Sequence, residues 1–423
     1  MTDPVDESML TPEWFTQSLK QNWSGYMGIP TILTCRSEAV EQGVLSRVYR
    51  VHLDFENESS GSTASKPVTT TLDESSIPPN LWIVKFRRDE LDLEWMFVTE
   101  TAFYSKFRNP LLHAVDDSST DLPFEIPQML HGSNDCIVLK GIPHATCYQL
   151  SQGCPRDKVY LLLECLSAWH ATCWESPLFQ DEKLVSLLSN PPGIGQRLDK
   201  LQLEHLSHQD WSMFLNNITD MDPKLRQASQ TLCETLAPLR LRNVQERVQE
   251  QKWTCVHGDY HIANWLFPNN DDAKRKPVLV DWATCGHGNP MVDVAFFLVV
   301  SSNDEVVSNV HPWLGRYYER LLKWNPKIQL TYDTCCEWFQ WALLNQWMIL
   351  VAYDGMGRGI AQAEPDASKR QRMLNHFQNL NRRVLLCMTS SLEWTKIIES
   401  LPIATKEERN QAKAYSDQTP IAI

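Results

Sequence analysis

The pattern of apolar and polar positions divides the chain into a strand-rich first part and a helical second part. Short apolar runs bounded by glycine, proline and small polar residues predict strands, and these runs occupy residues 43–53, 81–86, 126–130 and 136–139. Apolar side chains at helical spacing predict a lead-in helix over residues 1–35 and a second helix over residues 90–107. This combination favours a small lobe that mixes a sheet with helices.

A helical periodicity begins after Pro143 and continues through most of the remaining chain. Between Val159 and Cys173, apolar residues recur three and four positions apart, which is typical of an amphipathic helix. Residues 180–250 and 317–394 also have a helical pattern, and the second of these stretches is rich in tryptophan. The second part of the chain is therefore predicted to be mainly helical.

These patterns predict an α+β protein of two lobes, with a small β-rich lobe at residues 1–140 and a larger helical lobe at residues 141–423. Residues 58–80 interrupt the first lobe, and they consist mainly of serine, threonine, glycine and proline. Because such a composition buries little apolar surface, this segment is predicted to be a disordered insertion between two strands.

Two apolar segments of the second part carry a distinctive set of polar side chains. Residues 256–267 contain Asp259 and Asn264, and residues 278–282 form a short apolar strand that carries Asp281. The residues between the two segments are turn formers and charged residues, which predicts a hairpin-like unit. We expect the ends of this unit to present the two carboxylates and the amide together.

A carboxylate that acts as a base, together with two oxygen ligands for a metal ion, is the arrangement that phosphoryl transfer requires. Because that reaction depends mostly on positioning and charge neutralisation, one oriented carboxylate suffices to accept a hydroxyl proton, and Asp259 is the predicted base. Asn264 and Asp281 offer hard oxygen atoms, which Mg²⁺ prefers. Asp and Asn also favour turns for purely local reasons, but their joint spacing between apolar strands disfavours that alternative.

One lysine lies in an otherwise apolar predicted strand, at position 85. A lysine there is costly unless it pairs with a carboxylate or reaches a cleft. Lys85 and Glu100, on the next predicted helix, are therefore expected to form an ion pair that grips the phosphates of a nucleotide. The alternative is that Lys85 lies near the strand end and extends its ammonium group into solvent.

The first predicted strand of this lobe, residues 43–53, opens on a single glycine. Backbone N–H groups at Gly43 and the hydroxyl of Ser46 are the predicted contacts to the phosphates. The segment lacks the several glycines of a typical phosphate loop, so an ordinary hairpin turn is the open alternative.

Histidine and cysteine residues around the hairpin raise zinc binding as an alternative. His257 and His261 are four positions apart, as two ligands on one helix face would be. Their segment contains Gly258, however, and it lacks both a helical pattern and a glutamate beside the first histidine. We therefore favour a structural role in the loop for the histidines over zinc binding. The other residues considered for zinc are Cys255, Cys285 and His287.

Further polar and aromatic residues of the second part are interpreted as structural. Asp293, near the start of its predicted helix, is expected to support the loop by accepting backbone N–H groups or by pairing with the region of His257. His170 lies on an apolar helix face and is interpreted as a core histidine with satisfied hydrogen bonds. Several late tryptophans are interpreted as core, with a substrate pocket as the alternative, namely Trp338, Trp341 and Trp347.

Composition and charge narrow the class of function. The chain has 423 residues, of which 43% are hydrophobic and 22% charged, and this balance supports a packed core. Its formal net charge of −13 argues against nucleic acid or an anionic membrane as the main partner. The acidic N-terminus lacks a signal-peptide pattern, and the 12 cysteines form no compact framework, so we expect a cytoplasmic protein with reduced thiols.

Four motifs occur in a fixed order along the chain. They are Glu-x-x-Phe-Tyr at residues 100–104, Leu-x-x-x-His-Ala with a later Trp at residues 166–174, His-Gly-Asp-x-x-x-x-Asn at residues 257–264, and Asp-Trp followed by Gly-x-Pro-x-x-Asp-x-Ala at residues 281–295. In order and spacing they resemble the aminoglycoside phosphotransferase and choline kinase-like superfamily. Within that superfamily, the ecdysteroid kinase-like branch is the most similar.

The resemblance implies a protein-kinase-like fold of two lobes, with ATP bound by the first lobe and catalysis and substrate binding in the second. It implies Mg²⁺ as a cofactor and transfer of the γ-phosphate to a hydroxyl of a small molecule. Asp259 would be the base, Asn264 and Asp281 the metal ligands, and Lys85 with Glu100 would hold the phosphates. One alternative is a non-catalytic nucleotide-binding scaffold on the same fold. A protein kinase is disfavoured because no His-Arg-Asp, Asp-Phe-Gly or Ala-Pro-Glu segment occurs.

Overall fold

The computed structural model describes residues 7–23, 31–40, 46–56, 79–88, 93–113, 121–150, 153–190, 192–193, 222–227, 244–268, 275–390 and 396, except for the side chains of residues 351–357 and 360. Nearly all of the predicted insertion at residues 58–80 and most of the predicted helices between residues 180 and 250 lie outside the described residues. The chain forms two compact units. The first comprises Met1–Pro110, Phe124–Thr146 and Leu266–Ala283, and the second comprises Leu111–Pro123, Cys147–Trp265 and Thr284–Ile423.

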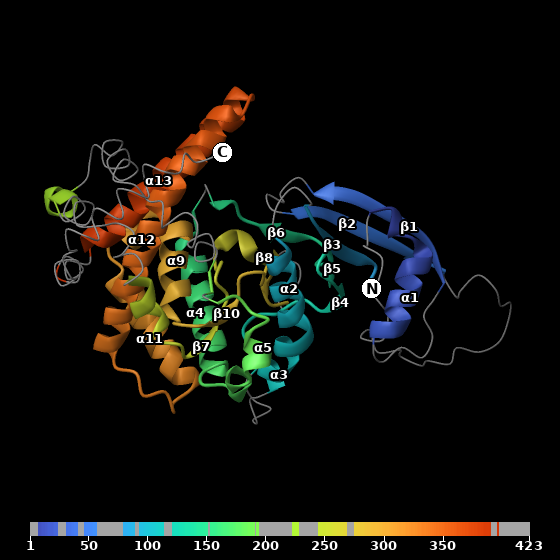
Figure 1. Ribbon diagram of the computed structural model, residues 1–423, viewed down its shortest axis with the longest axis horizontal. Coiled ribbons are helices and arrows are strands. Elements are labelled where there is room, and N and C mark those ends of the chain that lie inside the picture. Colours follow the sequence, from blue (N-terminus) through green and yellow to red (C-terminus); the bar gives the residue numbers. More distant parts are fainter. Residues whose placement is uncertain are drawn as a thin grey trace, which may run out of the picture. The chain divides into compact units, whose positions relative to one another are not determined.

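A five-stranded antiparallel sheet forms the centre of the first unit (Figure 1). Its strands lie in the order β1-β2-β3-β5-β4, and their bounds are β1 Ile32–Val40, β2 Ser46–Phe55, β3 Leu81–Arg87, β4 Met129–Gly132 and β5 Cys136–Lys140. The four strands predicted from the apolar runs correspond to β2, β3, β4 and β5 within a few residues.

The strand β1 was not predicted. The pattern indicated one lead-in helix over residues 1–35, whereas the structure places the helix α1 at Pro12–Asn22 and begins β1 at Ile32. The reason is that β1 is an edge strand in which only Ile32 is buried, so its side chains show no apolar alternation. The helix prediction was therefore wrong for residues 32–35.

The two faces of the sheet carry different helices. On one face, Trp82 of β3 packs near Phe15 of α1, with 6.4 Å between the ring centroids. Because successive side chains of a strand point to opposite faces, Lys85 of β3 lies on the other face. There it contacts Glu100 of α2 (Glu94–Ala102). Strand alternation thus turns the one lysine of β3 toward the helix that carries its partner.

Helix α2 continues directly into a π-helical turn, Phe103–Phe107, and then into α3, Arg108–His113. In the π-helical turn, the backbone N–H of Arg108 donates to the carbonyl oxygen of Phe103. The helix predicted over residues 90–107 is confirmed from Glu94 onward, with a local widening that its sequence did not indicate, and residues 90–92 lie outside the described residues.

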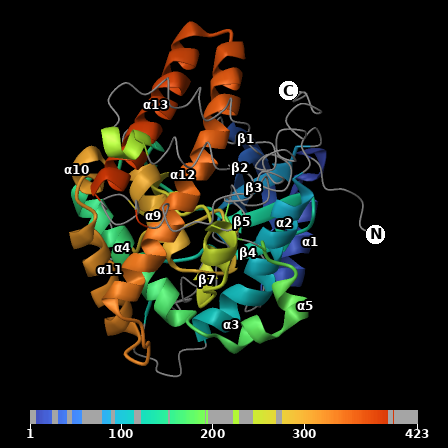
Figure 2. The same ribbon diagram turned by 60° about the vertical axis from the view of Figure 1, so that its left-hand side comes forward.

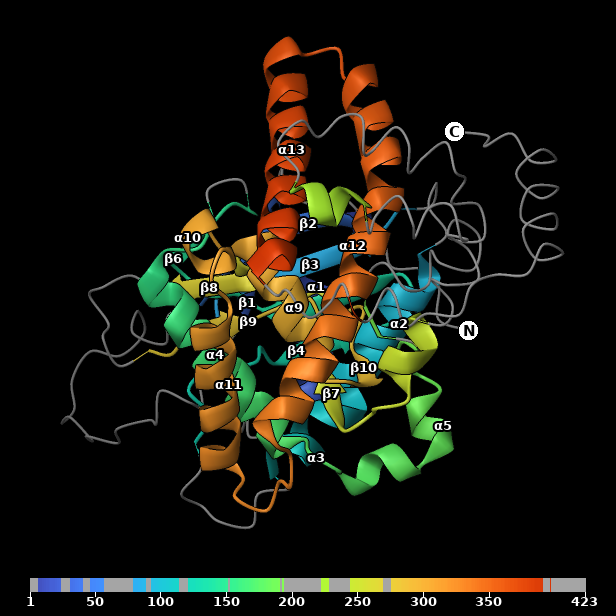
Figure 3. The ribbon, with the colours of Figure 1, turned by 90° about the vertical axis from the view of Figure 1, so that its left-hand side faces the viewer.

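The second unit is mainly helical. Helices α4 and α11 pack against each other, and α12 and α13 run antiparallel side by side and both contact α9 (Figures 2 and 3). The helices are α4 Arg156–Thr172, α5 Glu182–Val185, α9 Met291–Ser301, α10 Asp304–Val307, α11 His311–Trp324, α12 Tyr332–Ala363 and α13 Ala367–Ser390. The predicted α+β class, with a β-rich first part and a helical second part, is confirmed. Within the described part of the chain, none of the helices has both the length and the apolar character needed to cross a bilayer.

Short strands flank the loop that carries the predicted base. Strand β7 (Thr254–Val256) pairs with β10 (Gly286–Gly288). Strand β8 (Trp265–Pro268) lies between β6 (Ala145–Cys147) and β9 (Val278–Leu279) in a three-stranded sheet. Strands β8 and β9, which come from the two predicted apolar segments, are neighbours in this sheet, whereas the pairing of β7 with β10 was not predicted.

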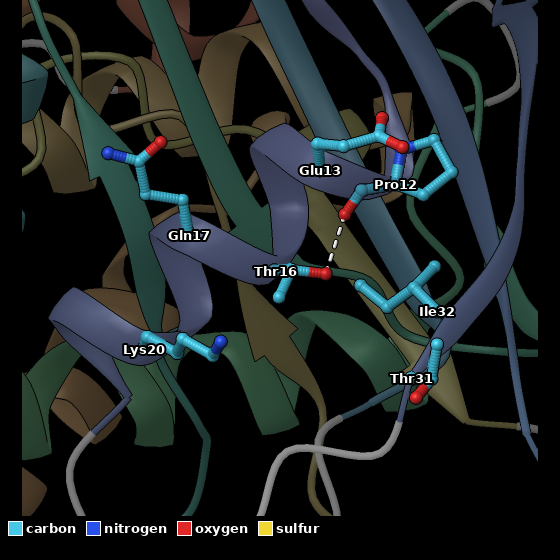
Figure 4. A pocket seen from close by; sticks show the side chains of 7 residues that line it. All are labelled: Pro12, Glu13, Thr16, Gln17, Lys20, Thr31 and Ile32. Atoms are coloured by element: carbon cyan, nitrogen blue, oxygen red, sulfur yellow. Dashed lines mark hydrogen bonds between the residues drawn. The ribbon is translucent and has the colours of Figure 1, made fainter.

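A surface hollow of about 450 Å³ lies on the exposed side of α1, where Thr16 and Lys20 line it together with Thr31 and Ile32 (Figure 4). The hydroxyl of Thr16 donates to the carbonyl oxygen of Pro12 at 2.7 Å. No described residue of the predicted site lines this hollow.

Candidate active site

The first unit brings Lys85, Glu100 and Asp281 together. Nζ of Lys85 lies 2.7 Å from Oε2 of Glu100 and 2.9 Å from Oδ1 of Asp281. The side chains of Lys85 and Glu100 are 13% and 2% exposed, whereas that of Asp281 is 39% exposed. One ammonium group therefore bridges a buried carboxylate and an accessible one.

The charges of this cluster act strongly on one another. Burial acts to lower the pKa of Lys85, but the attraction of Asp281 and Glu100 outweighs burial and leaves that pKa above its ordinary value. Burial raises the pKa of Glu100, while Lys85 opposes this rise and Asp281 adds to it. Lys85 is therefore charged at neutral pH, and two carboxylates share its single positive charge.

Asp281 has an unusual backbone conformation. Its φ angle is 68°, in the left-handed region that residues with a side chain rarely adopt. Aspartate tolerates this region better than most residues, but the conformation still has to be held by its surroundings. Strained residues of this kind concentrate at functional sites.

The predicted phosphate turn is only partly described. Ser46 is the first residue of β2, lies opposite Arg87 of β3 and is 9% exposed. Gly43 lies outside the described residues. The contacts of these two residues with phosphates stay a prediction.

The second unit ties the loop after β7 to the first turn of α9. Asp293 is fully buried, and its Oδ2 accepts the backbone N–H of His257 at 2.7 Å. Its Oδ1 accepts the backbone N–H of Gly258 at 2.8 Å. Oδ1 of Asn289 accepts the backbone N–H of Met291, the first residue of the same helix, at 2.9 Å. The carboxylate of Asp293 therefore holds the main chain that leads to Asp259.

Gly258 allows the close packing of this loop. Its φ angle is 83°, and a Cβ atom at this position would overlap the carbonyl oxygen of Thr284 and lie 2.8 Å from the nitrogen of Gly193. The hydroxyl of Thr284 donates to the carbonyl oxygen of His257 at 3.3 Å. Both the backbone angle and the space therefore require glycine.

The carboxylate of Asp259 has one occupied oxygen and one open oxygen. Oδ2 lies 3.3 Å from Nδ2 of Asn264 and 3.4 Å from Nε2 of His261. Nδ2 of Asn264 also donates to the backbone oxygen of Asp259 at 2.8 Å. Within the described residues, Oδ1 of Asp259 accepts no hydrogen bond.

The same neighbours set the charge of Asp259. Burial acts to raise its pKa, but His261, His257 and the amide of Asn264 together outweigh burial and hold the pKa below its ordinary value. Asp259 is therefore ionised at neutral pH, and Oδ1 is the oxygen able to accept a proton. The contact of His261 with Asp259 was not predicted, because His261 was assigned only a general structural role in the loop, with zinc binding as the alternative.

A buried hydrogen-bond network stands behind the loop. His170 of α4 is fully buried, and its Nδ1 lies 2.8 Å from the hydroxyl of Tyr317, on α11. Its Nε2 lies 3.2 Å from Oδ2 of Asp293. The carboxylate can only accept, which assigns the proton to Nε2 and leaves Nδ1 to accept from the tyrosine hydroxyl. His170 is the core histidine that the pattern indicated, but its link to Asp293 was missed.

The residues considered for zinc have other contacts. Nδ1 of His257 accepts the backbone N–H of Asp259 at 3.3 Å, and the ring of His287 stacks on Phe179 with 4.3 Å between centroids. Cys255 and Cys285 are buried thiols. Among the residues that the structure describes, no three His, Cys, Asp or Glu side chains are grouped to hold a metal ion.

The sequence identifies the family of the chain. Residues 41–330, more than half of the chain, match the model of the ecdysteroid kinase-like family, and the chain belongs to this family. The matched range contains all the predicted site residues, and the resemblance drawn from the four motifs is confirmed. No curated protein matches the sequence.

Several solved structures of small-molecule kinases show weak similarity to the chain. A microcompartment-associated aminopropanol kinase is 11% identical over 89% of this chain and 98% of its own, with a TM-score of 0.45. The ternary complex of APH(2″)-IIa with streptomycin and ATP is 13% identical over 89% and 97%, with a TM-score of 0.42. The ADP-bound aminoglycoside phosphotransferase APH(2″)-Ib is 14% identical over 90% and 99%, with a TM-score of 0.41. All three TM-scores are below 0.5, so the family assignment rests on the sequence match.

Proposed function

We propose that the chain is an ATP-dependent phosphotransferase that transfers the γ-phosphate to a hydroxyl of a small molecule. The observation that carries this proposal is the cluster in which Lys85 contacts both Glu100 and Asp281. A charged lysine in an apolar strand costs stability, and a kinase retains one there because a lysine paired with a glutamate holds the nucleotide phosphates.

Nucleotide binding is assigned to the first unit. Lys85 binds phosphate oxygens, and Glu100, which is buried and bonded to Nζ, fixes the direction of the lysine side chain. Gly43 and Ser46 cover the phosphates through backbone N–H groups and a hydroxyl. Phosphate oxygens would take the place that Asp281 now occupies at Lys85, which frees an accessible carboxylate.

Asp281 and Asn264 are the proposed magnesium ligands. Nδ2 of Asn264 donates both of its hydrogen bonds to Asp259, so Oδ1 of Asn264 stays available for a cation. Asp281 supplies a carboxylate that is 39% exposed. Hard oxygen atoms of this kind suit Mg²⁺, which in kinases neutralises charge on the β- and γ-phosphates.

Asp259 is proposed as the base. Its open Oδ1 accepts the proton of the acceptor hydroxyl while the hydroxyl oxygen bonds to the γ-phosphorus and the bond from phosphorus to the bridging oxygen of ADP breaks. His257 and Asp293 support this step indirectly, because they hold the backbone on either side of Gly258. The products are ADP, the phosphorylated acceptor and one proton on Asp259.

The proposed partner is a neutral or cationic small molecule with a hydroxyl group. The net charge of −13 disfavours nucleic acid and anionic membranes as partners. A cytoplasmic location, where Mg-ATP is available, is part of the proposal. Steroids, amino alcohols, sugars and aminoglycosides are the acceptor classes to be compared.

The Asp259→Asn variant tests the base. It is expected to abolish phosphate transfer while the dissociation constant for Mg-ADP changes by less than about threefold, because removing a base does not remove phosphate contacts. The control is Asp304→Asn, which removes a carboxylate that is 39% exposed in the same unit. Transfer by Asp259→Asn at the wild-type rate would refute the assignment.

The acceptor can be found by ligand-induced stabilisation. Candidate alcohols of the four classes are added to the protein with Mg-ADP present, and a rise in melting temperature marks a binder. A compound that stabilises the wild-type protein should then consume ATP with the wild-type protein and not with Asp259→Asn. Failure of the wild-type protein to bind Mg-ADP would refute the proposed function as a whole.

A further inference from the structure

Trp282 directly follows the proposed metal ligand Asp281, and it is stacked face to face on a second aromatic ring. Its indole and the ring of Phe103 have centroids 4.0 Å apart and planes 7° apart. Both side chains are fully buried. A parallel stack with such a short distance between the ring centroids is uncommon, because aromatic pairs more often lie edge to face or at larger separation.

Phe103 occupies a distinctive place in its helix. It is the first residue of the π-helical turn Phe103–Phe107, and it follows α2, the helix that carries Glu100. Single π-helical turns inside helices are often found at functional sites. The stack therefore connects the residue after Asp281 to the end of the helix that holds the lysine partner.

Three further contacts involve Glu100, Asp281 and Trp282. The carboxylate of Glu100 accepts the backbone N–H of Trp282, and Nζ of Lys85 contacts both Glu100 and Asp281. The turn at Asp281 is thus held by an ion pair, a backbone hydrogen bond and a ring stack. All of these contacts lie within the first unit.

These contacts act on a strained residue. The left-handed φ of 68° at Asp281 is unfavourable for a residue with a side chain, and it persists only where neighbours hold it. The ion pair with Lys85 is the contact that nucleotide binding would remove. The stack of Trp282 on Phe103 does not involve Lys85, so it can keep the backbone of Asp281 in place after the lysine turns to phosphate.

We propose that Phe103 and Trp282 form a positioning pair that holds the carboxylate of Asp281 in place for a divalent cation. Through this pair, the position of the Asp281 carboxylate depends on the position of helix α2. This inference rests on the proposed function for the identity of the cation site. It assigns Phe103, far from Asp281 in sequence, a role in metal-dependent nucleotide binding.

The Phe103→Leu variant tests the pair, with Phe15→Leu as its matched control. Phe15 is also fully buried in the first unit, but it lies on the α1 face of the sheet near Trp82. Titration calorimetry on the full chain measures the affinity for ADP with Mg²⁺ and with EDTA. Phe103→Leu should weaken Mg-ADP binding about 10- to 100-fold, as residues that orient metal ligands do, and leave ADP binding in EDTA unchanged. Phe15→Leu should change neither affinity, and Trp282→Phe, which keeps a ring against Phe103, should retain most of the Mg-ADP affinity.

A crystal structure of nucleotide-free Phe103→Leu gives a second readout that needs no ligand. We expect Asp281 to leave the left-handed region or to separate from Lys85. The proposal is overturned if Phe103→Leu binds Mg-ADP as Phe15→Leu does, if both ADP affinities fall equally, or if Asp281 keeps both its left-handed backbone and its contact with Lys85 in that structure. If the wild-type protein binds ADP equally with and without Mg²⁺, the proposed metal site fails, and the crystal structure still decides whether the stack positions Asp281.

Discussion

Replacing Asp293 with asparagine tests whether one buried carboxylate holds the loop of Asp259 in place. In the wild-type protein its two oxygens face three donors, the backbone N–H groups of His257 and Gly258 and Nε2 of His170. Asparagine has nearly the same shape but a single acceptor oxygen, so its NH₂ group must face one of these donors. At least one charge-assisted hydrogen bond is lost, and two donors are left facing each other.

The size of this loss follows from the burial of the site. A hydrogen bond to an ionised group contributes about 1.5–3 kcal/mol, and a buried donor without an acceptor costs about 1–3 kcal/mol. Asp293 is fully buried, so solvent does not replace the missing acceptor. We therefore expect the free energy of unfolding of the second unit to fall by about 3–5 kcal/mol, a large share of the roughly 5–15 kcal/mol that stabilises a typical domain.

Urea denaturation of the full chain, followed by tryptophan fluorescence and circular dichroism, measures this change. Separate transitions are analysed separately, because a chain of two units need not unfold in one step. The control Asp304→Asn removes an ion pair of 2.7 Å with Arg382, whose side chain is 59% exposed, and should change the free energy by less than about 1 kcal/mol. A loss for Asp293→Asn no larger than that of the control would refute the idea that this carboxylate holds the loop.

Two further predictions concern the same region. Gly258→Ala should destabilise the protein by about 2–5 kcal/mol, because alanine is strained in the left-handed backbone region and its Cβ atom would overlap the carbonyl oxygen of Thr284. A urea midpoint equal to that of the wild type would contradict this prediction. Burial, aided by Lys252, lowers the pKa of His287 to about 4, so the unfolded chain binds a proton more readily than the folded one below pH about 6.5. The free energy of unfolding should therefore decrease by roughly 1–3 kcal/mol as the pH falls from about 6.5 to about 4. The variant His287→Phe, which keeps the stack on Phe179, should reduce this decrease. If the urea midpoint of the variant depends on pH as that of the wild type does, His287 is excluded as the source of the decrease.

Elements with a regular apolar period could be predicted from the sequence. Strand β3 is a continuous apolar run because it is the central strand of the sheet, and α4 shows a clear helical period because one of its sides packs against α11. Strand β1 could not be predicted, because an edge strand with one buried residue has no pattern to detect. The π-helical turn at Phe103–Phe107 has no sequence signal either, since helical spacing is the same on both sides of it.

The candidate site was predictable only in part. The contact of Lys85 with Glu100 was expected because a lysine in an apolar strand needs a carboxylate, and the next helix offers one. The contact of His170 with Tyr317 joins residues 147 positions apart and depends on how α4 packs against α11. No local pattern indicates which buried hydroxyl a histidine will meet.

By itself the sequence indicated the residue types of the candidate site, which are a lysine, a glutamate, two aspartates and an asparagine, and it showed that the chain belongs to the ecdysteroid kinase-like family. These features depend on side-chain type and short-range spacing, which a sequence displays directly. Only the tertiary structure decided that Asp281 takes a left-handed backbone, that Trp282 stacks on Phe103 and that His170 links Tyr317 to Asp293. The physical reason is that strain and buried hydrogen bonds exist only between segments that packing has already brought into contact.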